Sequence, residues 1–513
     1  MGGRVLTRAG RAGIVTVTGR SPLKTLTLLS LILGLAGPMT AQRANPVVDI
    51  GDRRELFVDR ALIDQLKGVR LELARPRDAG PVFAFDRPWE GPFCGYATVI
   101  RDGQRLLLYY RGLPTAGGDG TDLERTCVAI CERGDRFVRP SLSKYEVAGA
   151  EHNNVVLAGE APVSHNFSPF LDAHVAADSP HRFKALGGNE ESGLLAYTSP
   201  DGLDWRRLQD KPVLVGAEFD SQNVAFWSDH EQRYVCYLRT WTGEGYAGIR
   251  TVSRATSEDF VTWSKPVEMT FGDGGGAEEH LYTNQTHPYM RAPHIYVAIA
   301  ARFMPGRQVL SEADAGRLGV NPRYFRDCSD AVLLTSRGGV RYDRTFREAF
   351  LRPAVGLQNW VSRSNYPALN VVQTGPAEMS FYVNQNYAQP TAELRRYALR
   401  LDGFASLRAG FGGGTARTRT LRFSGTQLEL NFATSAAGSV RAAICDEGGR
   451  VVPGFGLEDC VPLIGNEIAR RVVWRRGGGA VSGDVSGLRG RAVQLLLEIV
   501  DADVFAMQFA RLR

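Results

Sequence analysis

One structural unit recurs five times along this chain, and the recurrence limits the possible fold more than any other feature. Its clearest copy is residues 218–263, which run from a polar cluster through an apolar strand, a turn, an alternating strand and a Gly-rich loop to a Trp ending. Strands separated by such short turns are typical of an antiparallel sheet. Similar openings stand at Val99, Phe170, Pro288 and Pro367, at steps of 54 to 79 residues. Internal repeats of this kind indicate a repeat architecture.

Each opening is followed by an ending in the same order along the chain. Two endings are close matches, TSPDGLDW up to Trp205 and TSEDFVTW up to Trp263, and weaker ones stand near Arg136, Tyr342 and Phe404. Five openings that alternate with five endings predict an all-β fold, a five-bladed β-propeller whose first strands line a central channel. A large β-sandwich with accidental similarity among its hairpins is the alternative.

The rest of the chain divides around this propeller. We expect residues 46–407 to form it, with the segment before the first blade either leading into that blade or lending a strand to the last one. Residues 408–420 are rich in Gly and Arg and predict a linker. Polar and apolar residues alternate through several short strands in residues 421–513, which predicts a separate C-terminal β-sandwich.

Residues 1–45 have the pattern of an export signal. Several Arg and Lys residues precede the apolar run LTLLSLILGLAG, and small residues follow it up to Ala41. The run is only about a dozen residues long, which is too short to cross ~30 Å of hydrocarbon. We therefore expect cleavage after Ala41 and a periplasmic or secreted protein without stable membrane insertion. An uncleaved anchor is the alternative.

Charge and motifs argue against several partner classes. The formal net charge of +6 comes from scattered Arg residues and the N-terminal stretch, and no basic stripe with interleaved aromatics predicts nucleic-acid binding. The sequence has no HExxH, Cys/His cluster or calcium-binding loop, so no cofactor is expected. A single ion held in the channel by His and carboxylates is the alternative. The sequence leaves the oligomeric state undetermined.

The seven cysteines include no CxxC pair. Cys127 and Cys131 lie on an expected strand, and buried thiols are the favoured interpretation. Cys445 and Cys460 flank the segment GGRVVPGFGLED, and a disulfide between them in an oxidising compartment stays open.

Polar and aromatic residues gather just before each hairpin, where the first strand of each blade begins. The mouth of a propeller channel is formed there, so we expect these side chains to converge from five segments. In chain order the candidates are Asp86, Trp89, Glu90, Tyr96, His165, Asn166, Asp220, Gln222, Asn223, Glu279, His280, Tyr282, Asn284, Gln285, Trp360, Arg363, Ser364 and Asn365.

This mixture of side chains suits a sugar. Hydroxyl groups pair with carboxylates, amides and Arg, a sugar ring stacks on an aromatic face, and cleavage of a glycosidic bond uses two carboxyl groups with different pKa values. Asp220, Glu279 and Glu90 are the candidate catalytic residues, and a turn or strand-end role is the alternative for each. His165 and His280 either orient such a group or are structural.

The fivefold pattern, the SPDGLDW ending and the C-terminal strands resemble the five-bladed propeller glycoside hydrolases, the superfamily that includes families 32 and 43. The segments LFVDRALI, FDRPWEG, HNFSPFLDA, FDSQNVAFW, EHLYTNQ and NWVSRSNYPA are similar to those of uncharacterised exported bacterial members. The resemblance implies acidic residues on the first strands of blades 1, 2 and 3, acting as base or nucleophile, transition-state stabiliser and general acid. By position, blade 1 offers Glu90 or Asp86 and blade 3 offers Asp220.

The chain departs from the pattern of that superfamily at several points. Blade 1 has no N-D-P-N-G, blade 2 no R-D-P and blade 3 no E-C. His165 and Asn166 stand where blade 2 would carry its carboxylate, and blade 4 supplies the additional Glu279. The resemblance therefore supports the fold more firmly than the mechanism.

The expected function is that of an exported glycoside hydrolase acting on a poly- or oligosaccharide. Asp220 or Glu90 would act as base or nucleophile and Glu279 as proton donor, with His280 tuning it. Trp89, Trp360 and Arg363 would bind the sugar. The further substrate-binding candidates are Asp86, His165, Asn166, Gln222, Asn223, His280, Tyr282, Asn284 and Asn365.

Two alternatives stay open. One is a propeller that binds carbohydrate without catalysis. The other is a sialidase-like hydrolase, which SPDGLDW suggests and which would need three arginines around a nucleophilic tyrosine. The arginines considered for that role are Arg111, Arg239, Arg291 and Arg363.

Overall fold

The computed structural model describes residues 47–132, 136–147 and 149–511. The expected export signal lies outside these residues. No helix within the described ranges is long and apolar enough to span a membrane.

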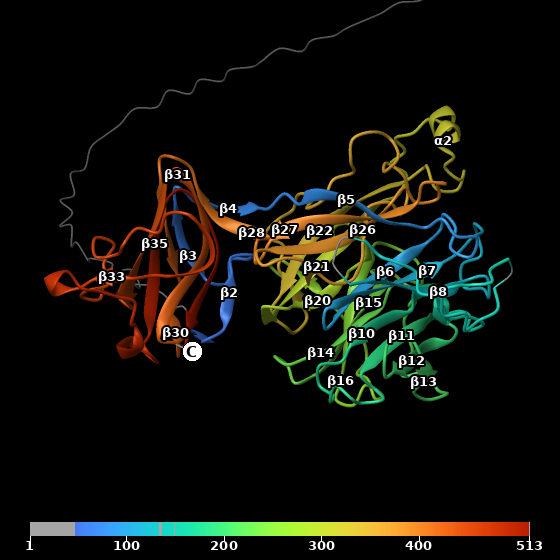
Figure 1. The fold of residues 1–513 in the computed structure, drawn as a ribbon, viewed down its shortest axis with the longest axis horizontal. Coiled ribbons are helices and arrows are strands. Elements are labelled where there is room, and N and C mark those ends of the chain that lie inside the picture. Colours follow the sequence, from blue (N-terminus) through green and yellow to red (C-terminus); the bar gives the residue numbers. More distant parts are fainter. Residues whose placement is uncertain (1–46, 133–135, 148, 512–513) are drawn as a thin grey trace, which may run out of the picture. The chain divides into compact units, whose positions relative to one another are not determined.

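The predicted five-bladed propeller is confirmed, because five antiparallel sheets follow one another along the chain (Figure 1). Blade 1 consists of β6 (Gly95–Asp102), β7 (Arg105–Gly112), β8 (Arg125–Cys131) and β9 (Val155–Leu157). Blade 2 consists of β10 (Ser168–Leu171), β11 (Phe183–Asn189), β12 (Gly193–Ser199) and β13 (Arg206–Arg207). Blade 3 consists of β14 (Val224–Ser228), β15 (Arg233–Trp241), β16 (Arg250–Ser257) and β17 (Val267–Glu268).

In the last two blades the first strand is interrupted. Blade 4 pairs β19 (His280–Thr283) and β20 (Thr286–Tyr289) with β21 (Ala292–Met304), which in turn pairs with β22 (Cys328–Ser336); nearby β18 (Thr270–Phe271) pairs with β23 (Arg341–Tyr342). Blade 5 pairs β24 (Tyr366–Pro367) and β25 (Val372–Gln373) with β26 (Glu378–Gln385), followed by β27 (Glu393–Arg400) and β5 (Arg77–Ala84). The N-terminal strand β5 thus closes the ring, which is one of the two outcomes that the sequence left open.

The inner strands are buried along almost their whole length. β7 and β21 show nearly continuous burial, as expected for strands whose sheets are covered on both faces by neighbouring blades. Alternating burial is clearest in the long C-terminal strand β35 (Val493–Ala510).

The repeated endings form turns on the outer edges of the blades. Asp201 Oδ1 accepts hydrogen bonds from the backbone N–H groups of Leu203 and Asp204, and the Trp205 indole donates to the Gly202 carbonyl. Asp259 and Trp263 make the same contacts one blade later. The acidic residues of these endings are therefore structural.

The C-terminal strands form a ten-stranded sheet that also takes strands from the other end of the chain. Its members are β1 (Val48–Gly51), β2 (Arg54–Leu56), β3 (Ile63–Lys67), β4 (Val69–Leu73), β28 (Ala405–Ala409), β29 (Gly414–Thr418), β30 (Leu421–Phe423), β31 (Gln427–Asp446), β32 (Asn466–Arg471) and β35. The blue strands β2, β3 and β4 lie among the orange and red ones in Figure 1. A separate hairpin joins β33 (Trp474–Arg475) to β34 (Val481–Ser482).

This sheet differs from the domain boundaries expected from the sequence. The sequence predicts residues 48–73 within the propeller and residues 408–420 as a linker, yet both segments form strands of the ten-stranded sheet. The Gly-rich part of the linker turns between β28 and β29. Cys445 and Cys460 are buried thiols in this region and form no disulfide with each other.

The far ends of the five first strands line an apolar cavity of about 340 Å³. Its lining includes residues from every blade, among them Val99, Phe170, Ala225, His287 and Leu369. Convergence of these five segments on one cavity locates the central channel of the propeller.

Two buried glutamines link the blades across the channel. Gln222 Nε2 donates to Thr98 Oγ1 at 2.8 Å, and Gln285 Nε2 donates to Gln222 Oε1 and to the Pro367 carbonyl at 2.7 Å each. Blades 1, 3, 4 and 5 are joined by these bonds, which separate the apolar cavity from the strand starts.

Candidate functional site

The starts of the five first strands meet through aromatic and polar contacts. The ring of Tyr96 in blade 1 lies 5.4 Å from that of His165 in blade 2, and its hydroxyl donates to the Asp220 carbonyl in blade 3 at 3.4 Å. Tyr282 of blade 4 lies 5.1 Å from Tyr366 of blade 5, measured between ring centroids. We refer to this region as the channel mouth.

Tyr282 is surrounded by three arginines. The guanidinium carbons of Arg239, Arg250 and Arg363 lie 4.9, 5.1 and 5.7 Å from its ring centroid. Burial would raise the pKa of Tyr282, but the positive charges of these arginines outweigh that effect and lower it to about 8. A phenol in this setting ionises far more readily than an ordinary tyrosine.

The strand register of blade 3 explains two of these arginines. Arg239 and Trp241 are two residues apart on β15 and therefore point to the same face. Trp241 pairs directly with Arg250 on β16, and the Arg250 guanidinium lies 4.3 Å from the indole centroid. A single antiparallel pair thus directs two guanidinium groups and one indole towards β19 of the next blade.

Three carboxylates belong to the channel mouth. Asp220 forms an ion pair with the buried Arg239 and keeps about a third of its own side chain exposed (36 %). Asp119 Oδ1 lies 3.2 Å from Arg111 Nη1 and 3.6 Å from Arg363 Nη1. Partial burial opposes ionisation of Asp119, but Arg111, Arg363 and His165 hold its pKa below the usual value.

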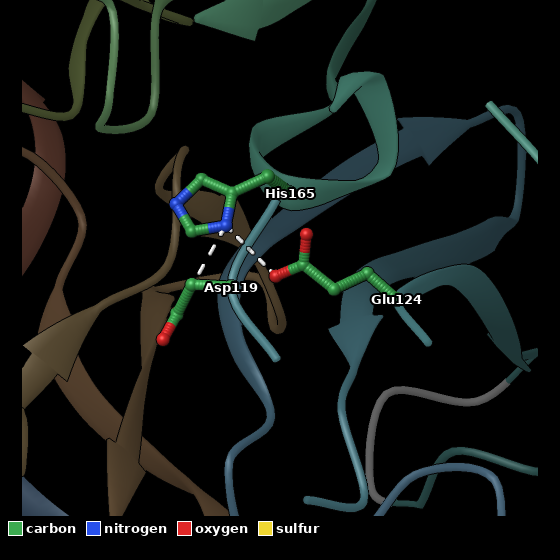
Figure 2. A group of neighbouring side chains, drawn as sticks. All are labelled: Asp119, Glu124 and His165. Carbon is green, nitrogen blue, oxygen red and sulfur yellow. Dashed lines mark hydrogen bonds and ion pairs between the residues drawn. The ribbon is translucent and has the colours of Figure 1, made fainter. Parts of the chain in front are cut away.

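The third carboxylate, Glu124, is fully buried and orients His165. Glu124 Oε1 lies 2.8 Å from His165 Nδ1 (Figure 2). The other carboxylate oxygen of Glu124 accepts a hydrogen bond from the Gly120 N–H. We assign the Nδ1 proton to the bond with Glu124, which leaves Nε2 for proton transfer. His165 is held by the short helix α1 (Val163–Asn166).

Asp119, Glu124 and His165 have the donor set of a metal site, since their ligand atoms lie within 4.8 Å of one another (Figure 2). Arg111 Nη1, however, lies 3.1 to 3.3 Å from one ligand atom of each residue. A divalent ion bound at 2.0 to 2.6 Å from the same atoms would stand against this guanidinium. The cluster therefore fits an internal cation supplied by the chain itself.

His280 lies at the edge of the mouth beside Arg250. Its Nδ1 accepts a hydrogen bond from the Arg250 backbone N–H at 3.2 Å, and Arg250 Nη1 lies 3.3 Å away. Burial and the nearby guanidinium lower the pKa of His280, which keeps the ring neutral at neutral pH.

The structure places Glu279 and Glu90 outside the mouth. Residues alternate between the faces of a strand, so Glu279 points away from His280 and Tyr282 and instead pairs with Arg302 and Arg344. Glu90 is fully buried within blade 1, where Arg139 donates to both of its oxygens and the Tyr110 hydroxyl donates to one. Neither carboxylate can reach a ligand at the channel mouth in this arrangement.

Trp89, Asp86 and Trp360 likewise contact residues outside the channel mouth. Trp89 donates from its indole to Asn154 Oδ1 in the core of the blade, and Asp86 is exposed beside Arg139. Trp360 packs against an apolar cluster around the inserted helix α2 (Glu312–Leu318).

Five amides that the sequence suggested for sugar binding are buried and bonded within the fold. Asn166 Nδ2 donates to the carbonyls of Gly188, Phe219 and Ser221, and Asn365 Nδ2 donates to those of Ser329 and Asn359. The remaining three, which also bond to neighbouring segments, are Gln222, Asn223 and Asn284. Their donors are used to join strands and blades.

Sequence reasoning missed Asp119, Glu124, Arg250, Tyr324 and Tyr387. Tyr387 accepts hydrogen bonds from Arg111 and Arg363, and Tyr324 lies 5.4 Å from the Arg363 guanidinium. Most of these residues lie in or next to connections between second and third strands. The first strand of a blade runs away from the mouth and the second, antiparallel strand runs back, so the connection from the second to the third strand lies at the mouth. The order of the strands in the sequence could therefore have indicated these residues.

Comparisons with known proteins give no assignment. No family model and no curated protein matches the chain. Solved structures that it resembles include a glycoside hydrolase (12 % identity, 64 % of this chain and 92 % of that one, TM-score 0.42). An N-acetylgalactosamine deacetylase from F. plautii matches at 13 % identity over 65 % of this chain and 96 % of that one, with a TM-score of 0.39. A GH32 beta-fructofuranosidase of Bombyx mori matches at 11 % identity over 84 % and 94 %, with a TM-score of 0.38. Likeness at this level leaves the activity to be argued from the site.

Proposed function

We propose that this protein is an exported hydrolase that cleaves a glycosidic bond at the channel mouth of its propeller. The observation that carries the proposal is the position of Tyr282, a buried phenol among three arginines where the first strands of all five blades begin. The surrounding aromatic rings, carboxylates and guanidinium groups suit the faces and hydroxyls of a sugar.

In this proposal Tyr282 is the nucleophile. A phenol whose pKa is lowered to about 8 is partly ionised near neutral pH, and Arg239, Arg250 and Arg363 stabilise the phenolate. Its oxygen attacks the anomeric carbon while the bond to the leaving oxygen breaks, and that oxygen takes the Nε2 proton of His165, which enters this step protonated on both nitrogens and keeps its Nδ1 proton on Glu124. The result is a glycosyl-tyrosine intermediate with the leaving group released.

Water completes the cycle in the second step. Asp220 keeps the role of base that its sequence position suggested, because it is partly exposed and next to Arg239. It takes a proton from the water that attacks the anomeric carbon, and Tyr282 leaves as phenolate. Solvent then carries that proton from Asp220 to His165 Nε2, which restores the starting state of both groups. Two displacements at the same carbon give net retention of configuration.

The proposal is tested by trapping the intermediate. The purified chain is incubated with a panel of activated 2-fluoro glycosides, digested and analysed by mass spectrometry. We expect a glycosyl mass increase on the peptide that contains Tyr282 and none in Tyr282→Phe. A Tyr145→Phe variant, changed in an outer segment of blade 1, should label like the wild type. Labelling on any other residue would contradict the assigned nucleophile.

A carbohydrate-binding propeller without catalysis is the second candidate. It is favoured by the fact that all three carboxylates at the mouth form ion pairs with arginines. Sugar binding that is retained together with complete absence of turnover on the same ligand would support this candidate.

The sialidase-like alternative keeps one feature in its favour. Arg239 and Arg363, two of the arginines named for it, do flank a tyrosine. Arg291 instead forms an ion pair with Asp402, and Arg111 binds Asp119 and Glu124. The SPDGLDW ending lies in an outer turn, so it offers no support.

A further inference from the structure

Arg250 differs from the other arginines of the channel mouth in its partners. Arg111, Arg239 and Arg363 each form an ion pair with a carboxylate. Within the described part of the chain Arg250 forms none, and its Nε is buried without a hydrogen-bond partner. Glu190 and Glu218, which lie near Tyr246, make no ion pair with Arg250.

Aromatic rings surround the Arg250 guanidinium in place of a carboxylate. Its central carbon lies 4.3 Å from the Trp241 ring centroid and 5.1 Å from those of Tyr282 and Phe303. Burial and the charge of Arg239 both lower the pKa of Arg250, which indicates that its positive charge is incompletely compensated. An anion beside this group would supply the missing counter-charge.

Further donors without partners lie around the same point. Arg239 is only 2 % exposed, and its Nε and Nη1 have no hydrogen-bond partner although its Nη2 pairs with Asp220. The Trp241 indole N–H is also buried and unpartnered. Buried donors are nearly always satisfied in folded proteins, so this group of donors indicates a place for acceptor oxygens of a ligand.

The β15–β16 connection adds an apolar wall. Tyr246 lies in this connection, is half exposed, and its ring centroid is 5.9 Å from that of Trp241. Exposed aromatic faces beside a cation suit a ring that carries a negative group on its edge.

We propose that Arg250, Arg239 and Trp241 form a subsite for the negatively charged group of an acidic sugar residue, whose ring packs against Tyr246. The carboxylate of a uronic acid and a sulfate ester share the required chemistry. The inference rests on the proposed function only in taking the ligand to be a sugar, because the subsite binds its anion whether or not a bond is cleaved.

Binding measurements on the full chain test the inference separately from catalysis. Isothermal titration calorimetry uses oligogalacturonate and oligoglucuronate, neutral oligosaccharides of the same size, and sulfated galactose oligosaccharides. We expect one acidic class to bind at least about tenfold more tightly than its neutral counterpart, with affinity falling as salt rises. The uronate and sulfate arms identify which anion is preferred.

The variants are Arg250→Gln, Arg250→Lys and the matched control Arg233→Gln. Arg233 lies on β15 of the same blade, is exposed and makes no ion pair among the described residues, so its loss should leave binding unchanged. Arg250→Gln should weaken acidic-sugar binding by about 10- to 100-fold, and Arg250→Lys should restore part of it. Circular dichroism melting curves confirm that each variant is folded.

The outcomes separate the two proposals. Binding of acidic sugars that depends on Arg250 but occurs without any turnover would support the subsite and contradict the proposed hydrolase activity. Turnover of neutral glycans with unchanged KM in Arg250→Gln would retain the hydrolase and overturn the subsite. Equal affinity for acidic and neutral ligands, or equal affinity in wild type and Arg250→Gln, would also overturn it.

Discussion

The two ends of the propeller channel are built from the same five strands and have opposite characters. At the strand starts, arginines, tyrosines and carboxylates meet around Tyr282, and several donors lack partners. At the strand ends, an apolar cavity of about 340 Å³ is lined by residues such as Val99, Phe170 and Leu369. Between them lies the Gln222–Gln285 pair.

This difference teaches how one scaffold separates stability from chemistry. Residues below the glutamine pair fill space and bond to the fold, whereas the mouth leaves charged groups incompletely satisfied. Functional sites commonly retain such local violations of the packing rules that the rest of the fold obeys. Substitutions at the two ends should therefore give different phenotypes, and four predictions test that separation.

The largest effect is expected at the mouth. Tyr282→Phe removes the proposed nucleophile and should lower kcat by about 10²–10⁴-fold, while the free energy of unfolding changes by less than about 1 kcal/mol. Steady-state kinetics and urea unfolding measure the two quantities. A kcat reduced by less than about threefold would show that the phenol does not take part in the chemistry.

A large substitution at the opposite end should affect stability instead. Phe170 is buried at the apolar cavity, with its ring 5.5 Å from that of Phe260. Phe170→Ala should lower the free energy of unfolding by about 3–5 kcal/mol and leave kcat of the folded fraction unchanged. Met290 lines the same cavity and is 40 % exposed, so Met290→Ala should cost much less. A changed substrate preference in Phe170→Ala would show that the apolar end of the channel also takes part in function.

The glutamine pair should behave as part of the fold. Gln222→Leu removes the donor to Thr98 Oγ1 and one of the two acceptors of Gln285 Nε2, which keeps its bond to the Pro367 carbonyl, and it should lower the free energy of unfolding by about 1–3 kcal/mol. A double variant that also replaces Gln285 should cost less than the sum of the single changes. Denaturant unfolding tests this additivity, and full additivity would indicate that the pair is not coupled.

The smallest effect concerns pH. Because the folded pKa of Tyr282 is about 8 and lies below that of an ordinary tyrosine, phenolate forms as pH rises, and kcat/KM should rise to a plateau above about pH 8. The same ionisation adds stability only as pH rises from about 8 towards the unfolded pKa near 10, and none at pH 7. Arg250→Gln removes a neighbouring cation, so the rise of kcat/KM with pH should shift to higher pH by about one unit. The control Arg233→Gln should leave the pH profile of kcat/KM unchanged. An unchanged profile in Arg250→Gln would show that the rise in kcat/KM reports the ionisation of a group other than Tyr282.

Much of the fold could be predicted because the blade repeat is local. The openings at Val99, Phe170 and Val224 carry their own turns and strand patterns, and blade order follows from chain order. Membership of residues 48–73 in the C-terminal sheet could not be predicted, since pairing of β4 with β28 joins segments separated by the whole propeller. Strand propensity does not specify so distant a partner.

The site could be located from the sequence more readily than it could be assigned. His165, Asp220 and Tyr282 do lie at the mouth, but Glu279 is one residue out of phase with His280 and points to the other face of β19. Asp119 and Glu124 lie in the connection between the second and third strands of blade 1, away from the hairpin openings that carry the repeat. The effect of the arginines on Tyr282 depends on distances across blades, which a linear pattern does not contain.

The closure of the ring by β5 and the shared C-terminal sheet affect the order in which the molecule can be completed. The strands β2, β3 and β4 before the propeller pair with β35, β29 and β28 after it, so they must wait for those strands. During synthesis on the ribosome the early strands therefore remain without partners until nearly the whole chain has emerged. Because β35 pairs with β2, β28, β29 and β31, this last strand joins segments from both ends of the chain, and the sheet can be completed only after β35 has been made.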